Sequence, residues 1–497
     1  MQIIDCHIHP ATAGDYHANI TDLVRRMQRH NIAKAVISDL GDWSAYPDED
    51  TLIAANERVR RESLASDGRL EYLVYINPQL PDWRSIFDRF YPDACGVKLW
   101  ISLRKKGGSL DAAKEVLRLA AKCGLPVLIH TFDRTVSAHP GEIGVAEIIE
   151  LAGAVPGCLI VAAHSGGNWR KAVARAGEFP ENVVFDISGT YPERTMVRRL
   201  VDAFSSERIL YGSDAYGRSF GAQLSKLHDC GLSKTELENI LFLNARRVFR
   251  LSDIKPCQPE KLPVWNISDD NADNFCFTGK SEYWDHFATP EMLVGAAKRY
   301  GVDTLYAASL EALTASDRRR ANLLHRAECS AYPQIKPLAV ADLRDMAGAM
   351  ETVENTDGFA GVLISPYLHN YQLSYCDFAE FFDTCSKRDI PIWINTVLGD
   401  DRFRDPRLET RVVKDDEIIS FASQAPVCRY TIQGTVCSPA LSRALPCCFK
   451  LECSGLFDWE YAPDDTFRDG VPERLVYGSG YPFREYGCVK RLTGSCS

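Results

Sequence analysis

Short apolar runs alternate with amphipathic runs through the first half of the chain. Eight of the apolar runs are rich in β-branched residues and apolar on both faces, which is typical of buried parallel strands. They cover residues 3–9, 33–39, 70–77, 96–101, 126–131, 158–164, 183–188 and 209–213. Residues 111–122 and 233–251, between or after them, have the apolar spacing of helices. This succession of βα units predicts an α/β fold, a (β/α)8 or TIM barrel.

The second half of the chain repeats this pattern. The segments GFAGVLISP, DIPIWINTV, CCFKLECSG and PERLVYGSGYP resemble DACGVKLWIS, GLPVLIHTF, NVVFDISG and SERILYGSDAY, at separations of 264 to 266 residues. A nearly constant separation over several strands indicates a tandem duplication of a whole barrel. We therefore expect one barrel at residues 1–254 and a degenerate TIM-barrel-like repeat at residues 263–497. The proline-rich stretch SDIKPCQPEKLP marks the boundary.

Residues that can bind a metal or move a proton end several strands of the first half. His7 and His9 end the first strand, His130 the fifth and His164 the sixth, and Asp214 follows the eighth. The carboxyl ends of barrel strands converge on one pocket, so these side chains can share one ion. Histidines two residues apart on a strand point to the same face. With His130 and Asp214 they form a set of three imidazoles and one carboxylate, which suits zinc or another divalent first-row ion.

Other roles for these residues stay open. Asp214 could also take a proton from a metal-activated water, and His164 could act as a general acid or base or only cap the next helix. His7 and His9 could instead be buried core residues. Lys98, near the end of the fourth strand, could be a substrate cation, a metal bridge or a partner in a structural ion pair.

The repeat lacks these residues although it keeps the strand pattern. The positions that match His130, Asp214, Lys98 and His164 are Asn395, Gly480, Leu363 and either Gln433 or Gly434. The His-x-His pair of the first strand has no counterpart in the matching region, VWNISDDNAD. The strand framework persists in the repeat while these polar side chains are lost. We therefore interpret the N-terminal residues as taking part in metal binding or catalysis rather than in packing.

Composition excludes several other classes of protein. The formal net charge is −10 and the chain shows no basic stripe, which argues against a nucleic-acid partner. Apolar runs are too short for a membrane span and the chain opens on a strand, so we expect a cytoplasmic protein without a membrane partner. The 17 cysteines are odd in number and form no CxxC pair. We expect them to be reduced.

Four motifs in order resemble those of the amidohydrolase superfamily. They are DCHIHP at the start, a histidine ending strand five, AAHSGG ending strand six and YGSDAY ending strand eight. They are most similar to the branch that contains aminocarboxymuconate-semialdehyde decarboxylase. The resemblance covers the N-terminal barrel in full and the second half only as a framework. It implies that His7, His9, His130 and Asp214 hold one divalent ion, here expected to be Zn, and that His164 is catalytic. Lys98 stands where two-metal members carry a carboxylated lysine.

The resulting expectation is a metal-dependent hydrolase that acts on an amide, ester or lactone bond of a small carboxylated molecule. The alternative is a metal-dependent, non-oxidative decarboxylase of a small organic acid. Trp100, Arg134 and Arg218 on the loops, together with Lys98, could bind such a substrate, because guanidinium groups bind carboxylates bidentately. The C-terminal half could act as an internal, inactive partner of the first barrel. A non-enzymatic binding protein remains possible, although the complete ligand set speaks against it.

Overall fold

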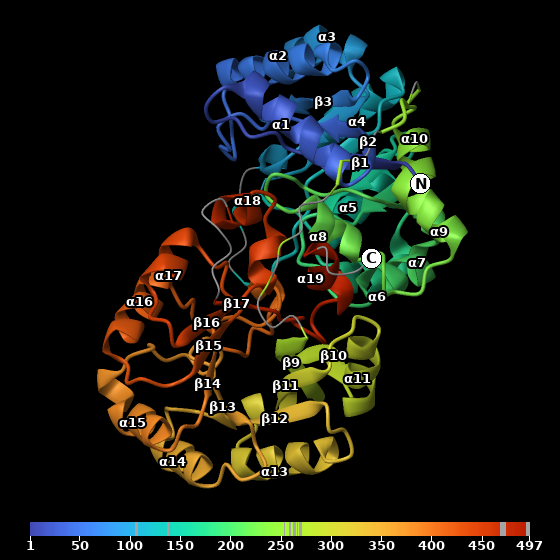
Figure 1. Cartoon of the computed structure of the whole chain (residues 1–497). Coiled ribbons are helices and arrows are strands. Elements are labelled where there is room, and N and C mark those ends of the chain that lie inside the picture. Colours follow the sequence, from blue (N-terminus) through green and yellow to red (C-terminus); the bar gives the residue numbers. More distant parts are fainter. Residues whose placement is uncertain are drawn as a thin grey trace. The chain divides into compact units, whose positions relative to one another are not determined.

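The computed structural model of the chain describes residues 1–104, 108–136, 139–252, 254–257, 260–261, 265, 267, 271–467 and 474–493. Two compact units account for the chain (Figure 1). The first contains Met1–Thr190 and Thr195–Leu262, and the second contains Tyr191–Arg194 and Pro263–Ser497. Much of the predicted boundary stretch SDIKPCQPEKLP and of VWNISDDNAD lies outside the described residues.

The first unit is a parallel barrel of eight strands. The strands are β1 (Ile3–Ile8), β2 (Ile32–Ile37), β3 (Leu70–Ile76), β4 (Gly96–Leu99), β5 (Val127–Ile129), β6 (Ile160–Ala162), β7 (Val183–Asp186) and β8 (Ile209–Leu210). They pair in sequence order. The ring closes where the Cys6 N–H donates to the Tyr211 carbonyl at 3.0 Å and Ile8 pairs with Ala215. The predicted TIM barrel is therefore confirmed.

Helices follow the strands of this barrel. They are α1 (Tyr16–Arg29), α2 (Glu49–Ala65), α3 (Trp83–Phe90), α4 (Asp111–Cys123), α5 (Val145–Ala154), α6 (Trp169–Ala174), α7 (Met196–Phe204), α8 (Phe220–Ser225), α9 (Lys234–Glu238) and α10 (Asn244–Val248). The predicted helix at 111–122 corresponds to α4. The predicted helix at 233–251 corresponds to α9 and α10, joined by a π-helical turn over Asn239–Leu243.

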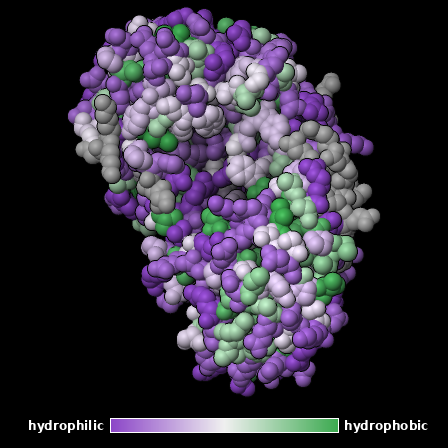
Figure 2. All heavy atoms as spheres, turned by 90° about the vertical axis from the view of Figure 1, so that its left-hand side faces the viewer, coloured by the Kyte–Doolittle hydropathy of each residue, from purple (hydrophilic) through white to green (hydrophobic). Residues whose placement is uncertain are grey.

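Hydrophobic burial explains why these strands are apolar on both faces. Successive side chains of a strand point to opposite sides of a sheet. One set of alternate residues forms a single cluster with α10: Ile4, Val36, Leu73, Leu128, Val161, Val184 and Leu210. The other set packs with the larger helices in a second, more extensive cluster. On the face shown in Figure 2, by contrast, hydrophilic residues predominate and hydrophobic ones form scattered small groups.

The second unit contains a sheet of the same kind with an added hairpin. Its strands are β9 (Ala272–Ser281), β10 (Trp284–Ala288), β11 (Thr304–Ser309), β12 (Ile335–Ala341), β13 (Gly361–Ile364), β14 (Ile392–Asn395), β15 (Tyr430–Gln433), β16 (Phe449–Glu452) and β17 (Leu475–Val476). β10 pairs with β9 in an antiparallel manner, and the others run parallel in sequence order. The Asn274 N–H donates to the Tyr477 carbonyl at 2.9 Å, which joins β9 to the last strand.

The helices of the second unit cover the outside of its sheet, as Figure 1 shows for α13 to α17. They are α11 (Pro290–Lys298), α12 (Leu310–Thr314), α13 (Arg318–Cys329), α14 (Met346–Glu354), α15 (Ala379–Lys387), α16 (Asp415–Gln424), α17 (Pro439–Ala444), α18 (Ala462–Phe467) and α19 (Gly487–Leu492). This arrangement confirms a second, degenerate TIM-barrel-like domain. In neither unit does the described part of the chain contain a helix long and apolar enough to cross a membrane.

A shared hydrogen bond identifies the counterpart of the His-x-His pair. Asp5 accepts a hydrogen bond from the His7 N–H at 3.0 Å, and Asp273 accepts one from the Phe275 N–H at 3.0 Å. Phe275 therefore takes the place of His7, and Phe277 completes a Phe-x-Phe pair. The repeat thus has no His-x-His pair, as expected, but the matching positions lie just after VWNISDDNAD and not within it.

A second shared bond resolves the position opposite His164. Asp186 accepts a hydrogen bond from the His164 N–H at 2.9 Å, and Glu452 accepts one from the Gly434 N–H at 3.1 Å. Of the two residues left open by the sequence, Gly434 is thus the structural equivalent of His164. These equivalences agree with the tandem duplication, which itself stays a prediction.

Apolar packing replaces the polar residues in the second unit. Phe275, Phe277 and Leu363 belong to one buried hydrophobic cluster, together with Trp393 and Phe483. Buried apolar side chains stabilise a fold without needing partners for their charges. The second barrel therefore contains hydrophobic core where the first contains titratable groups.

We expect one buried histidine of the second unit to make stability depend on pH. The His369 ring donates from Nε2 to the Leu313 carbonyl at 2.9 Å, and burial lowers the pKa of His369 to about 4. An unfolded histidine has a pKa of about 6.5, so acidification protonates the unfolded state first. Between about pH 7 and about pH 5 this group should cost roughly 2 kcal/mol of stability.

Urea unfolding at the two pH values measures this loss. His369→Gln should lose less stability on acidification than the unmodified chain, whereas His139→Gln, at an exposed histidine, should behave like the unmodified chain. An acid-induced loss of the same size in all three proteins would contradict the assignment.

Candidate active site

Two imidazoles face each other at the carboxyl end of β1. His7 and His9 are both buried, and their Nε2 atoms lie 3.0 Å apart. His7 Nδ1 lies 2.9 Å from Asp186 Oδ2, and His9 Nδ1 lies 2.9 Å from the Ser38 carbonyl oxygen. A carboxylate or carbonyl oxygen accepts a hydrogen bond, so each Nδ1 carries the hydrogen and each Nε2 presents a lone pair.

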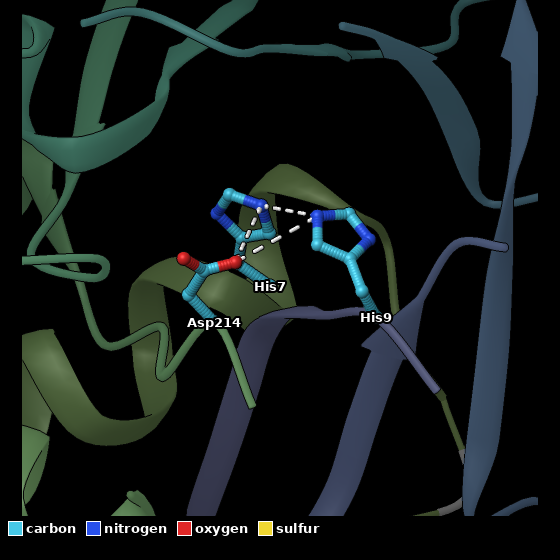
Figure 3. Close-up of side chains that lie close together, drawn as sticks. All are labelled: His7, His9 and Asp214. Carbon is cyan, nitrogen blue, oxygen red and sulfur yellow. Dashed lines mark hydrogen bonds and ion pairs between the residues drawn. The ribbon is translucent and has the colours of Figure 1, made fainter. Parts of the chain in front are cut away.

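The two facing lone pairs repel each other, and a positive charge near both would remove this repulsion. Burial and the nearby Lys98 lower the pKa of His7 and of His9 well below the usual value, so both rings are neutral at physiological pH. Asp214 Oδ1 lies 4.0 Å from His7 Nε2 and 3.8 Å from His9 Nε2. Figure 3 shows the carboxylate turned towards both rings. Ligand atoms of these three residues all lie within 4.8 Å of one another, a spacing that one ion can bridge.

Lys98 brings a cation to the same place. It is the second-to-last residue of β4, is fully buried, and its Nζ lies 2.9 Å from His7 Nε2. Burial lowers the pKa of Lys98 to about 8, although the nearby Asp214 and Asp186 carboxylates act to raise it. Near neutral pH the ammonium form prevails and donates to the His7 lone pair. An ion and this ammonium group would therefore compete for one nitrogen.

A second pair of imidazoles lies beside the first. His164 Nε2 is 3.3 Å from His130 Nδ1, and His130 Nε2 is 3.0 Å from Glu142 Oε1. Burial lowers the pKa of both histidines. Of the four predicted ligands, the structure groups His7, His9 and Asp214, and it places His130 next to Glu142. Among the described residues a second set with metal-ligand spacing consists of His7, His164 and Asp186.

Backbone geometry aims two of these side chains. His164 and Asp214 have positive φ angles of 56° and 62°, which are unusual for residues with a side chain. Such a conformation costs free energy and turns the chain sharply at the end of each strand. A Cβ atom at Gly189 would collide with the His164 ring, so glycine is required there. These constraints explain how His164 reaches the first imidazole pair.

Asp186 is a member of the site that the sequence analysis missed. It ends β7 and is fully buried. Besides the His7 ring and the His164 N–H, its carboxylate accepts hydrogen bonds from the Ser188 N–H at 2.9 Å and the Ser188 hydroxyl at 2.6 Å. A usable signal was present, because an acidic residue ends the seventh strand in both halves of the chain. Glu142 had no such signal, since it lies in a loop without a matching segment.

An aromatic wall borders the imidazoles. The Trp100 ring centroid is 6.4 Å from that of His130 and 5.9 Å from that of Trp43, with the rings nearly perpendicular. Trp43 also packs edge-on against His9 at 5.7 Å. Trp100 thus lies beside the imidazoles, and its contact with a substrate stays a prediction.

The two predicted substrate-binding arginines have internal partners. Arg134 donates from Nε to Glu142 Oε2 at 2.9 Å and lies over the Phe132 ring. Arg218 donates to the carbonyl oxygens of Gly189 and Gly217 at 3.1 and 2.8 Å. Their binding of a substrate carboxylate stays a prediction.

Comparisons with known proteins found one matching family and several similar solved structures. The model of a family described as Amidohydrolase matches residues 4–251. Three solved structures are similar over 50% of this chain. The 2,6-dihydroxybenzoate decarboxylase from Rhizobium is 17% identical over 99% of its own chain, with a TM-score of 0.40. A putative amidohydrolase from Staphylococcus aureus is 16% identical over 100% of its chain, with a TM-score of 0.42. A probable 2-pyrone-4,6-dicarboxylic acid hydrolase from Acinetobacter baumannii is 13% identical over 100% of its chain, with a TM-score of 0.38. No curated protein matches.

We expect Asp186→Ala to destabilise the first barrel by about 3 kcal/mol, because several buried donors lose their acceptor at once. Urea unfolding measures the loss. Asp88→Ala, at an exposed carboxylate on α3, is the control and should change stability by less than about 0.5 kcal/mol. A loss at Asp186 no larger than that at Asp88 would show that the carboxylate does not hold the site together.

Proposed function

Residues 4–251 belong to the amidohydrolase family, and we propose that their barrel is a metal-dependent hydrolase of a C–N or C–O bond in a small carboxylated molecule. The family match confirms the expectation of an amidohydrolase-type enzyme. One observation carries the proposal: two neutral imidazoles present their lone pairs to each other at 3.0 Å, with the Asp214 carboxylate beside them. This arrangement is favourable when a cation lies between the three groups.

The donor set fits a divalent ion. Neutral imidazole nitrogens and a carboxylate oxygen are ligands that Zn²⁺ and other first-row ions prefer. Asp186 and the Ser38 carbonyl hold the rings of His7 and His9 through Nδ1, which is how the rings of metal-binding histidines are commonly oriented. Zn is our proposal for the ion. His130 as a further ligand stays a prediction.

An ion held there would supply Lewis acidity, which lowers the pKa of a water molecule and polarises a carbonyl group. Residues of the chain accept and donate the protons. Asp214, whose side chain is 25% exposed, can accept the proton that a water molecule loses as its oxygen bonds to the substrate carbonyl carbon. When the C–N or C–O bond breaks, the same proton can pass to the leaving nitrogen or oxygen. His164, which faces His130, can donate a hydrogen bond to the departing group.

Binding of the substrate would use the groups around the imidazoles. The Lys98 ammonium is buried in the site and can attract a carboxylate or a developing oxyanion, since opposite charges interact strongly where water is excluded. Trp100 offers a flat apolar surface beside His130. A small molecule with one carboxylate and a planar portion fits both features.

We expect the purified, reconstituted chain to retain about one divalent ion, measured by elemental analysis. His9→Asn should lose the ion because one of the facing nitrogens is gone. His17→Asn, at a histidine with a 73% exposed side chain on α1, should retain it. About two ions per chain would assign Lys98 as a bridge. An unmodified chain that retains none would refute the metal site.

For activity, a panel of small carboxylated amides, esters and lactones provides the test, with free acid and carbon dioxide measured side by side. Asp214→Asn should lower kcat for hydrolysis by about 10²- to 10⁴-fold, because the amide cannot accept the proton. Release of carbon dioxide without hydrolysis would replace the proposed reaction with decarboxylation. An unchanged kcat in the variant would remove Asp214 from the proton transfer.

A further inference from the structure

The ring of His130 is held from the side opposite His164. Its Nε2 lies 3.0 Å from Glu142 Oε1, and its Nδ1 lies 3.3 Å from His164 Nε2. We propose that Glu142 is a positioning residue that selects Nδ1 of His130 as the nitrogen presented to the site. The inference rests on the proposed function only in taking the carboxyl end of the first barrel as the place of reaction.

The first step is the charge of Glu142. Its side chain is only 1% exposed. Arg134 donates from Nε to Glu142 Oε2 at 2.9 Å, so a guanidinium, which is always charged, is paired with this carboxyl group and favours its ionised form. An ionised carboxylate only accepts hydrogen bonds.

The second step follows from the single hydrogen of a neutral imidazole. Glu142 requires that Nε2 of His130 be the protonated nitrogen, so Nδ1 has only a lone pair. That lone pair points to His164 and not to the loop. Any contact that His130 makes in the site, with an ion, a substrate hydrogen or the His164 ring, is therefore made by Nδ1.

The third step concerns Arg134, which fixes the carboxylate in turn. Arg134 donates from Nε to Glu142 Oε2 at 2.9 Å, while its guanidinium lies 4.7 Å from the centre of the Phe132 ring. Arg134 also reaches the other oxygen, from Nη2 to Oε1 at 3.5 Å, so the guanidinium holds both oxygens while Oε1 faces His130. This geometry makes Arg134 a support for His130 in addition to its predicted contact with substrate.

Glu142 contacts His130 Nε2 on one side and, with Arg134, lines a neighbouring cavity on the other. Both line a cavity of about 450 Å³ between the loop before α5 and helix α6, and His130 is not among the residues that line it. Removing the Glu142 side chain would open a path from this cavity to the Nε2 hydrogen. Exchange of that hydrogen with solvent is therefore a direct measure of the contact.

The test uses the full chain labelled with ¹⁵N-histidine and studied by NMR, with the His130 signals assigned by their absence in His130→Gln. We expect an Nε2–H signal protected from exchange and an Nδ1 signal of an unprotonated nitrogen. Glu142→Ala should remove the protected signal. Glu147→Ala, which alters another carboxylate lining the same cavity, should leave it in place. An Nδ1–H in the unmodified chain, or a protected Nε2–H in Glu142→Ala, would overturn the proposal.

A second variant and the addition of Zn²⁺ distinguish the remaining outcomes. If Glu142→Ala does not fold, Glu142→Gln should still show the Nε2–H, shifted because a neutral oxygen accepts it; an unshifted signal would count against Glu142. Addition of Zn²⁺ should leave the Nε2–H of His130 in place, and its loss would also overturn the proposal. Failure of the proposed function has a different signature, because the signals of His7 and His9 would then not respond to Zn²⁺ at all.

Discussion

The buried carboxylate of Asp186 is the constraint on which the site depends. It ends one strand, accepts the backbone N–H of His164 that follows another strand and orients the ring of His7 on a third. A buried charge is costly unless it is paired, so each of these contacts helps to keep the carboxylate in place. One carboxylate thereby positions both the ring that faces His9, which is His7, and the ring that faces His130, which is His164. A shift of any of the three strands would disturb both pairs of imidazoles.

The two barrels share backbone contacts at their strand ends but differ in the side chains found there. Glu452 repeats the role of Asp186 towards the backbone, since it accepts hydrogen bonds from the N–H groups of Gly434 and Ser454. The side chains that surround it differ in kind, because phenylalanine, leucine and glycine stand where the first barrel has histidine, lysine and aspartate. A carboxylate at the end of the seventh strand thus holds the backbone that follows the strands in both barrels. Among the described residues, the clustered imidazoles at the strand ends belong to the first barrel, and the matching positions of the second barrel are not histidines.

Periodicity in the sequence was sufficient to predict the strands, their order and the two barrels, because burial on both faces leaves a clear apolar signature. It was also sufficient to predict that His7, His9 and Asp214 lie close together, since strand alternation and barrel closure determine where such residues point. It could not reveal Glu142, whose contact with His130 depends on the path of a loop. It also missed Phe275 as the counterpart of His7, because a hydrogen bond of the backbone, and not side-chain chemistry, defines that equivalence.

The Phe-x-Phe pair of the second barrel has a consequence for how the chain responds to its surroundings. A barrel that closes its centre with phenylalanine needs nothing from the solution to complete its packing. A barrel that keeps facing imidazoles, a buried lysine and buried carboxylates can respond to dissolved ions, because those groups would bind them. A metal ion held as proposed would therefore link the first barrel, and not the phenylalanine cluster of the second, to the supply of metal in solution. The protein joins a half with polar, ion-binding chemistry at its strand ends to a half whose matching positions are packed with apolar side chains.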